Sequence, residues 1–265
     1  MRKNTTREAA MEVPYEKAAA ILSESECSIA VTGAGISVES GIPDFRSPGG
    51  IWAKYPPEQY ATIEAYLKNP AKVWRFWQEL ARDFAGCKPN RAHFALAALE
   101  QHGFLKAIVT QNIDALHQAA GSKTVIEYHG SARNLFCMDC GNTRPLDMLA
   151  AGAAPPRCHV CYGLMKPDIV MFGELIPGDA LRASAEWGEK CNAVLIVGTS
   201  AQVYPAADLP YIAKRHGARI IEANIEHTSF TETITDVFLQ GRAGETLPKL
   251  AQALGLDADG ADSAR

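Results

Sequence analysis

Residues 28–37 read Ser28-Ile29-Ala30-Val31-Thr32-Gly33-Ala34-Gly35-Ile36-Ser37. The first five are mostly apolar or β-branched and predict a short buried strand, and the glycines that follow let the backbone turn tightly and approach an anion. A helix that begins after such a turn offers free amide groups to a pyrophosphate. The strict dinucleotide-binding pattern fails, because Val38 stands at the position of the third glycine. On this motif alone, a ligand-binding turn and a purely steric turn are equally open.

Short β-rich apolar runs recur along the chain and alternate with segments of helical spacing. The runs cover residues 28–32, 105–110, 125–128, 193–197, 218–223 and 237–239, and the helical segments cover residues 15–23, 93–102, 180–190 and 206–216. Strands that alternate with helices predict a parallel sheet with helices on both faces. We therefore expect the α/β fold class.

Two stretches interrupt this alternation. Residues 52–84 are aromatic and helical in spacing, whereas residues 137–167 combine cysteine pairs with Pro and Gly turns. We expect both to be insertions that pack together as a smaller second domain. The predicted boundaries are 13–50, 91–132 and 168–255 for the large domain, 51–90 for the helical insertion, 133–167 for the cysteine-rich insertion, and 1–12 and 256–265 for loose ends.

Polar residues follow the predicted strands. They are Gly33 to Ser37 after the first, Gln111 to Asp114 after the second, His129 after the third, Gly198 to Ser200 after the fourth and Asn224 after the fifth. Ligands of an open parallel sheet bind beyond the carboxyl ends of its strands, so these groups should converge on one edge. A single histidine after a strand is more often structural, but the convergence favours a functional role for His129.

The segment 39–52 continues from the glycine turn and has the composition of a mobile loop. It contains Asp44, Phe45 and Arg46, which could contact a charged, aromatic ligand; the alternative is an ordinary surface loop with one anchoring aromatic. Asn112 and Asp114 alternate past a strand end, so both side chains could point at one ligand.

Four cysteines have the spacing of a zinc ribbon. Two Cys-x-x-Cys pairs, Cys137 with Cys140 and Cys158 with Cys161, are separated by seventeen residues. Four thiolates complete a tetrahedral zinc sphere, which predicts a structural metal without a catalytic role. Two redox motifs are the alternative. A nucleic-acid-binding ribbon is disfavoured, because Arg144 and Arg157 are the only basic residues between the pairs.

Composition narrows the function classes. The 265 residues include 26 basic and 30 acidic side chains, a net charge of -4, so no overall field favours nucleic acid or an anionic membrane. No stretch reaches the roughly 18 apolar residues of a membrane span. Seven cysteines, an odd number without a secretory signal, fit a reducing compartment. We expect a soluble cytoplasmic protein that binds neither nucleic acid nor a membrane.

Together these motifs resemble the sirtuin family of NAD-dependent protein-lysine deacylases, of the prokaryotic type. The matching segments occur in family order over about residues 28–245 and are 33–37, 41–46 (Gly-Ile-Pro-Asp-Phe-Arg), 110–114 (Thr-Gln-Asn-Ile-Asp), 129–130, the four cysteines, 166–174 and 198–200. The resemblance implies a Rossmann-type large domain and a small domain built from a four-cysteine zinc ribbon and the helical insertion. NAD and acyl-lysine would enter the cleft between them.

The resemblance also implies the site residues. The catalytic residues would be His129, Asn112 and Asp114. The NAD site would contain Gly33, Ala34, Gly35, Ser37, Asp44, Phe45, Arg46, Trp52, Gln111, Asn112, Ile113, Asp114, Gly198, Thr199, Ser200, Asn224, Ile225, Glu226 and Ala243. The acetylated protein or peptide would bind at Val170, Met171, Phe172, Gly173, Glu174 and Val203, partly as an added strand. From the pattern alone, residues 169–172 are simply a buried strand.

The implied reaction consumes NAD and transfers the acyl group to ADP-ribose, with His129 as the base. Family members that prefer succinyl or malonyl groups resemble one another in a Tyr-x-x-Arg pair, whereas this chain has Trp77 and Leu80 at the aligned positions. A buried anionic acyl group would lack a partner, so we expect acetyl or longer neutral acyl chains. A mono-ADP-ribosyltransferase and a silent NAD-binding scaffold are the alternatives, and we expect a monomer.

Overall fold

A six-stranded parallel sheet forms the centre of the computed structural model, which describes residues 3–147 and 151–257. The strand order is β3-β2-β1-β7-β8-β9. The strands are β1 (Ser28–Thr32), β2 (Ala107–Thr110), β3 (Val125–Glu127), β7 (Ala193–Val197), β8 (Arg219–Asn224) and β9 (Val237–Gln240). The direction of strand addition reverses between β1 and β7, and open α/β sheets bind ligands in the crevice at such a point.

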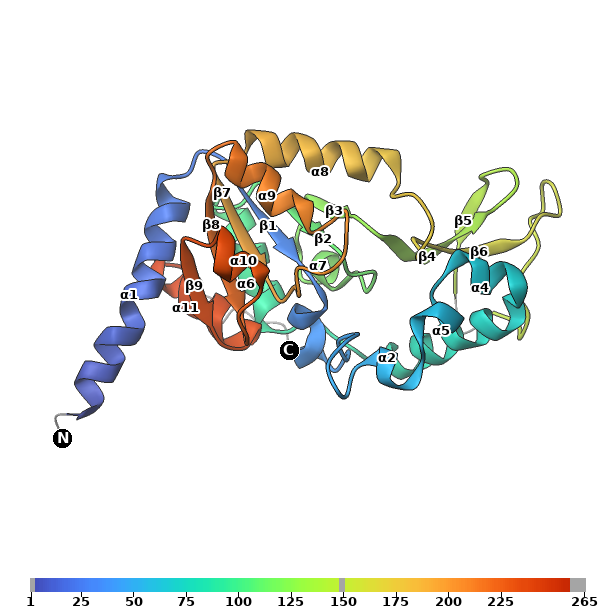
Figure 1. The fold of residues 1–265 in the computed structure, drawn as a ribbon, viewed down its shortest axis with the longest axis horizontal. Coiled ribbons are helices and arrows are strands. Elements are labelled where there is room, and N and C mark those ends of the chain that lie inside the picture. The colour runs from blue at the N-terminus through green and yellow to red at the C-terminus, as the bar shows by residue number, and fades with distance from the viewer. Residues whose placement is uncertain (1–2, 148–150, 258–265) are drawn as a thin grey trace.

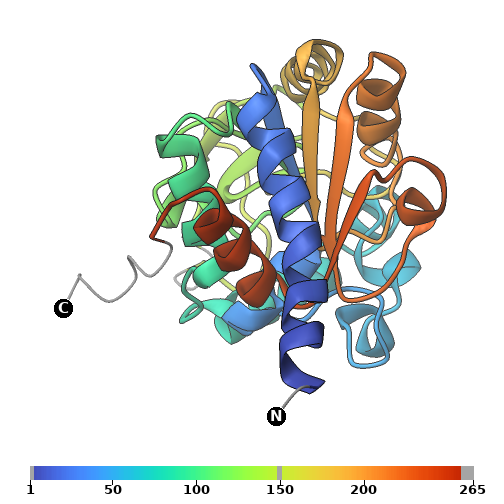
Figure 2. The same ribbon diagram turned by 90° about the vertical axis from the view of Figure 1, so that its left-hand side faces the viewer.

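Helices cover both faces of this sheet (Figure 1). They are α1 (Lys3–Glu24), α6 (Arg91–Gln101) and α11 (Ala243–Ala253) on one face, and α8 (Gly178–Lys190), α9 (Asp208–Arg215) and α10 (Ser229–Thr233) on the other. Figure 2 shows α1 and α11 side by side. Alternate strand residues face opposite cores, with Ala30 on the α1 side and Val31 on the α9 side. The predicted α/β fold class is confirmed.

A smaller domain projects from the large sheet (Figure 1). Its antiparallel sheet has the order β5-β4-β6, formed by β4 (Gly130–Cys137), β5 (Thr143–Pro145) and β6 (Met165–Ile169). Its helices are α2 (Ile51–Lys54), α3 (Pro57–Tyr60), α4 (Ile63–Lys68) and α5 (Pro70–Phe84). The two insertions pack together as expected, because Trp74 of α5 is fully buried against Leu135 and Met165 of the small sheet.

The chain ends differ from the prediction. Helix α1 begins at Lys3, so residues 3–12, expected to be a loose end, belong to a helix. This end of α1 extends beyond the sheet (Figure 1). Helix α11 was not predicted, because Pro248 interrupts its pattern. Leu256 still packs against the core, whereas residues 1–2 and 258–265 lie outside the described residues.

Among the described residues, none of the helices combines the length and the apolar character needed to cross a bilayer.

The turns after β1 and β7 are in direct contact. The N–H of Gly33 donates to the Val197 carbonyl (3.1 Å), and the N–H of Gly35 donates to the Gly198 carbonyl (2.8 Å). A Cβ on Gly35 would lie 2.7 Å from the Gly198 Cα, closer than real Cβ atoms approach. Both amides are bonded within the protein, so neither is among the free amide groups expected at the helix start. The turn continues into a 3-10 helix, η1 (Ala34–Ser40).

We predict that Gly35→Ala destabilises the protein by about 1–3 kcal/mol, because the methyl group would push the β1 and β7 turns apart. Gly86→Ala is the matched control, since a Cβ at Gly86 meets nothing within 4 Å. Urea unfolding measures both. Equal midpoints for Gly35→Ala and the wild type would show that the turns do not depend on this contact.

Candidate functional site

Side-chain hydrogen bonds link the ends of neighbouring strands in the large sheet. Gln111, after β2, donates from Nε2 to Thr199 Oγ1, after β7 (3.0 Å). Asn224, at the end of β8, donates from Nδ2 to the Thr199 carbonyl (2.9 Å). The Nδ1 of His129, after β3, lies 3.0 Å from the Gln111 carbonyl. The structure therefore brings these side chains to one edge of the sheet.

Asn112, Ser37 and Asp114 form a hydrogen-bonded chain beside the glycine turn. Asn112 Nδ2 donates to the Gly33 carbonyl and to Ser37 Oγ, both at 3.1 Å. The Ser37 hydroxyl donates to Asp114 Oδ2 at 2.7 Å, and Asp114 Oδ1 accepts from the N–H of Leu116. Because Asn112 is buried, these bonds fix the orientation of its amide and the position of the Asp114 carboxylate.

His129 is held in the form that can accept a proton. Its Nδ1 faces the Gln111 carbonyl, which can only accept a hydrogen bond, so we assign the proton of the neutral ring to Nδ1 and the lone pair to Nε2. Burial lowers the pKa of His129, and the hydrogen bond to Gln111 partly opposes this. The ring is therefore suited to be a general base near neutral pH. Tyr128, buried in the core, packs edge-on against it, with ring centroids 5.5 Å apart.

The loop after η1 is folded onto the small domain. Asp44 Oδ1 accepts from the N–H groups of Arg46 (2.9 Å) and Ser47 (2.8 Å), which closes a turn. The rings of Phe45 and Trp52 lie 4.9 Å apart in the apolar cluster around Ile51. Phe45 and Trp52 are thereby anchored, whereas the guanidinium-bearing residue Arg46 is exposed. This arrangement holds one aromatic and one cationic side chain next to each other in the loop.

Other residues predicted for the NAD site lie outside the hydrogen-bonded row. Ser200, Ile225 and Glu226 are exposed in the loops after β7 and β8, and Ile113 is half-buried in the loop after β2. Ala34 is half-buried at the start of η1. Val203, predicted to contact the substrate, is half-buried in the loop after β7. Ala243 is buried at the start of α11. Next to Ala243, the N–H of Gly244 donates to Glu39 Oε2 (2.6 Å), so a carboxylate that was not predicted occupies this helix start.

The segment predicted to bind the substrate lies beside His129. The N–H of Val170 donates to the His129 carbonyl (2.8 Å), and the N–H of Phe172 donates to the Ala61 carbonyl (2.9 Å). The segment is not one buried strand, since β6 ends at Ile169 and the Phe172 side chain is 44% exposed. Met171 is buried and Gly173 has a positive φ of 91°.

The Glu174 side chain binds to the backbone and to a lysine of its own segment. Its Oε2 accepts from the N–H of Met171 (2.9 Å) and lies 3.1 Å from the Nζ of Lys166. Lys166 is buried and also donates to the Ile169 carbonyl (2.7 Å). The carboxylate of Glu174, predicted to contact substrate, is thus engaged with its own chain.

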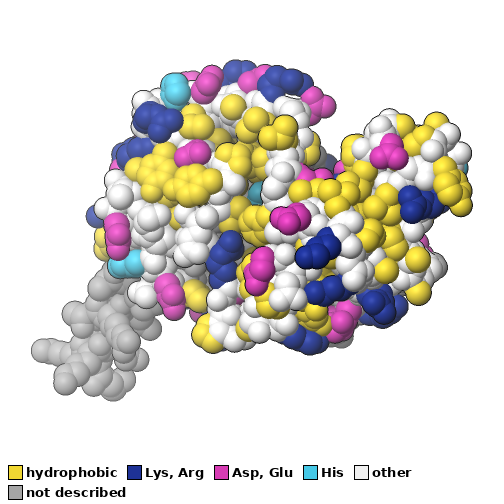
Figure 3. All heavy atoms as spheres, turned by 45° about the vertical axis from the view of Figure 1, so that its right-hand side comes forward, with side chains coloured by type: hydrophobic (Ala, Val, Ile, Leu, Met, Phe, Trp, Pro, Cys, Tyr) yellow, Lys and Arg dark blue, Asp and Glu magenta, His cyan; other side chains and the backbone are white. Residues whose placement is uncertain are grey.

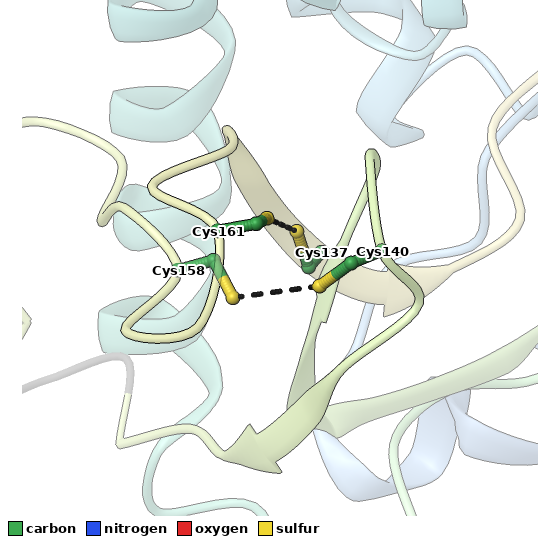
Figure 4. Close-up of side chains that lie close together, drawn as sticks. All are labelled: Cys137, Cys140, Cys158 and Cys161. Atoms are coloured by element: carbon green, nitrogen blue, oxygen red, sulfur yellow. Dashed lines mark hydrogen bonds between the residues drawn. The ribbon is translucent and has the colours of Figure 1, made fainter.

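Cys137, Cys140, Cys158 and Cys161 converge at one point of the small domain (Figure 4). All four sulfur atoms lie within 4.8 Å of one another. Cys137 and Cys161 are 3.5 Å apart, Cys140 and Cys158 are 3.7 Å apart, and the sulfurs form no disulfide. The N–H groups of Val160 and Gly163 point at Cys158 and Cys161, as suits negatively charged sulfur. These four residues could hold a metal ion.

Sequence reasoning missed a buried polar layer beneath the site. His117 Nε2 lies 2.9 Å from Thr32 Oγ1, which donates to Thr110 Oγ1 (2.9 Å), which in turn accepts from the N–H of Asn112 (3.1 Å). The ring of His93 lies 5.0 Å from that of His117. Thr32 and Thr110 end two strands whose sequences predict burial, which could have indicated a buried polar pair. Their pairing, however, depends on the register of β1 with β2, which the sequence does not give.

Comparison with known proteins gives consistent matches. A model of the Sir2 family matches residues 33–205. NAD-dependent protein deacylase 2 of Pyrobaculum aerophilum is 47% identical over 232 residues, which are 88% of this chain and 92% of that protein. A solved Sir2 homologue in complex with ADP-ribose has a TM-score of 0.87 at 40% identity, covering 91% of this chain and 96% of the other. A Sir2 variant solved with a deacetylated p53 peptide and 3'-O-acetyl-ADP-ribose has a TM-score of 0.84 at 36% identity, covering 91% and 98%.

The buried histidines predict how stability depends on pH. Burial lowers the pKa of His93 to about 4, against the opposing charge of Asp114, and burial together with His93 lowers the pKa of His117 to about 3. An unfolded imidazole has a pKa of about 6.5, so below that pH the unfolded chain takes up protons that the fold excludes. We predict that the free energy of unfolding falls as the pH falls from about 6.5 toward 4.

Urea unfolding at several pH values measures this slope. His117→Gln should reduce it by up to about 1.4 kcal/mol per pH unit. Identical slopes for His117→Gln and the wild type would show that His117 is not held neutral by the fold.

Proposed function

The chain belongs to the Sir2 family, and from this premise we propose that it removes acetyl and other neutral acyl groups from protein lysines, with NAD consumed as co-substrate. The observation that carries the proposal is the convergence of His129, Asn112 and Asp114 with the glycine turn on one sheet edge. The relatives named above include an NAD-dependent deacylase, and one solved Sir2 structure holds a deacetylated peptide with an acetylated ADP-ribose.

The reaction divides into displacement and acyl transfer. The acyl oxygen of the lysine attacks the anomeric carbon of the nicotinamide ribose, and nicotinamide leaves. The Nε2 of His129 then accepts a proton from a ribose hydroxyl, whose oxygen attacks the imidate carbon. Addition of water releases free lysine and O-acyl-ADP-ribose. A neutral ring with its lone pair on Nε2, as held by Gln111, is the form that this step requires.

Other side chains of the site have supporting roles in this proposal. Asn112 and Asp114 bind the ribose and fix its hydroxyl groups, because their own orientations are fixed through Ser37. Phe45 shields the reacting ribose from water and from returning nicotinamide. Its ring is anchored on Trp52, and the loop that carries it is closed by Asp44.

The acylated peptide binds beside His129 as an added strand. Val170, whose N–H meets the His129 carbonyl, and Gly173 belong to the segment that supplies the backbone for this pairing. Apolar side chains gather on the surface between the two domains (Figure 3). Trp77 and Leu80 lie in the apolar cluster around Ile51, which also contains Phe45. Apolar surroundings favour neutral acyl groups over carboxylates.

The four cysteines bind one structural zinc ion in this proposal. A tetrahedral site with zinc–sulfur bonds of about 2.3 Å places its sulfurs about 3.8 Å apart. The contacts of 3.5 Å and 3.7 Å fit that spacing. A complete set of four thiolates keeps no open position for substrate, so the ion stabilises the small domain only.

We also propose a cytoplasmic monomer. The seven cysteines, all within the described residues, form no disulfide bonds, which fits a reducing compartment. The oligomeric state stays a prediction.

The function is tested with an acetyl-lysine peptide, NAD and mass spectrometry. We predict loss of the acetyl group matched by O-acetyl-ADP-ribose, with much slower turnover of a succinyl-lysine peptide. His129→Ala should lower the rate by about 10²–10⁴-fold, the usual contribution of a general base. His102→Ala is the matched control, since this exposed ring also has Nδ1 beside a backbone carbonyl. ADP-ribosylated protein with unchanged acetylation would favour a transferase, and full activity of His129→Ala would remove its proposed role.

The metal site gives a separate prediction. Cys137→Ala should lose zinc, measured by elemental analysis, and should unfold the small domain at lower temperature, because the ion links β4 to the second cysteine pair. Cys87→Ala, outside the cluster, should keep both the metal and the stability. A metal-free Cys137→Ala protein with wild-type stability and activity would contradict the structural role.

A further inference from the structure

Glu222 is a fully buried carboxylate in the middle of the large sheet. It lies on β8 between Ile196 of β7 and Phe238 of β9, and its exposed fraction is 0%. Acidic side chains are rarely buried completely, because an ionised carboxylate removed from water needs compensating hydrogen bonds. The bonds that Glu222 makes therefore indicate why it is there.

Three threonine hydroxyls donate to Glu222. Thr228 Oγ1 lies 2.6 Å from Oε1, and Thr231 Oγ1 and Thr235 Oγ1 lie 2.7 Å and 2.8 Å from Oε2. The hydroxyl oxygens of Thr228 and Thr231 also accept hydrogen bonds from backbone N–H groups in the capping box of α10. The hydroxyl protons of these two threonines are therefore directed at the carboxylate. An ionised carboxylate accepts all three bonds, whereas a glutamine would turn an NH₂ group toward hydroxyl donors.

These bonds fix the connection between β8 and β9. Asn224 ends β8 and is tied to the Thr199 carbonyl, and Thr228 is tied to Glu222. Between these two anchors lie Ile225, Glu226 and His227, all three exposed. Two bonded residues, one at each end of a short exposed segment, leave its backbone little freedom.

This segment lies at the far end of the sheet edge from His129. His129 follows β3 and Asn224 ends β8, four strand spacings apart in the order β3-β2-β1-β7-β8. At about 4.8 Å per spacing the separation is roughly 19 Å, comparable to an extended dinucleotide. If His129 meets the nicotinamide ribose, and the glycine turn after β1 lies between, then Asn224 to Glu226 face the adenosine end.

We propose that Glu222 is a positioning residue that holds Asn224 to Glu226 in place for the adenosine half of NAD. The inference rests on the proposed function, since it takes NAD to be the ligand of this edge. Glu222 itself touches no substrate, because it is buried beneath the segment that it orders. It should therefore govern the affinity for NAD and leave the chemical step unchanged.

The test compares Glu222→Gln with the wild type in two measurements. Calorimetric titration with ADP-ribose reports binding without catalysis, and steady-state kinetics report KM for NAD, KM for the peptide and kcat. We expect ADP-ribose affinity to fall and KM for NAD to rise by on the order of tenfold, about the value of one hydrogen bond to a charged group. KM for the peptide and kcat at saturating NAD should not change.

Two further variants make the result decisive. Glu232→Gln is the matched control, with the same change at an exposed position of α10, and should behave as wild type. Thr235→Val removes one hydroxyl at nearly constant volume and should weaken ADP-ribose binding by a smaller factor in the same direction. Thr235→Val also tests the inference if the Glu222→Gln variant does not fold.

Wild-type ADP-ribose affinity in both Glu222→Gln and Thr235→Val would overturn the inference. So would a loss of kcat and peptide affinity equal to the loss of NAD affinity, which would indicate a general structural role. If the wild-type protein itself binds no ADP-ribose, the proposed function fails and this inference fails with it, and that outcome is seen before any variant is made.

Discussion

The contact between the glycine turns after β1 and β7 is the constraint on which the rest of the site depends. Gly35 and Gly198 approach so closely that a Cβ on either would overlap the other's backbone. The contact joins the two halves of the sheet at the point where strand order reverses. Because neither glycine can be replaced without moving a strand, every loop at this edge takes its position from the two turns.

From that contact a hydrogen-bonded row extends in both directions along the edge. Thr199 accepts a hydrogen bond from Gln111 at its hydroxyl oxygen and one from Asn224 at its carbonyl oxygen. The Gln111 carbonyl in turn lies against Nδ1 of His129. The same bond that places the ring selects its tautomer, and burial keeps the ring neutral. Position, proton location and basicity of His129 therefore follow from one local arrangement. The small domain begins immediately after it, at Gly130, so the ring stands where the two domains meet.

Much of the fold follows from the sequence, and the exceptions have physical reasons. Strands β1 and β7 were predicted with their observed bounds, because both are buried on two faces and bounded by turn residues. The spacing of the cysteines predicted their convergence, since four cysteines that bind one metal ion must lie close together. Hydrogen-bond partners that depend on register, such as Thr32 with Thr110 or Glu222 with Thr235, could not be predicted from residue type. The hydrogen bond from the Gly35 amide to the Gly198 carbonyl could not be predicted either, because the local sequence pattern indicates a free amide at that position.

In the proposed function, the imidazole of His129 faces the sugar of bound NAD. The most direct test is a crystal structure with a non-cleavable NAD analogue and an acetyl-lysine peptide, in which the distance from His129 Nε2 to the nicotinamide ribose hydroxyls is measured. We predict a hydrogen-bond distance of about 2.6–3.2 Å, with the ring still bonded to the Gln111 carbonyl. A dinucleotide bound away from the glycine turn, or a ring turned away from the ribose, would contradict this placement of His129.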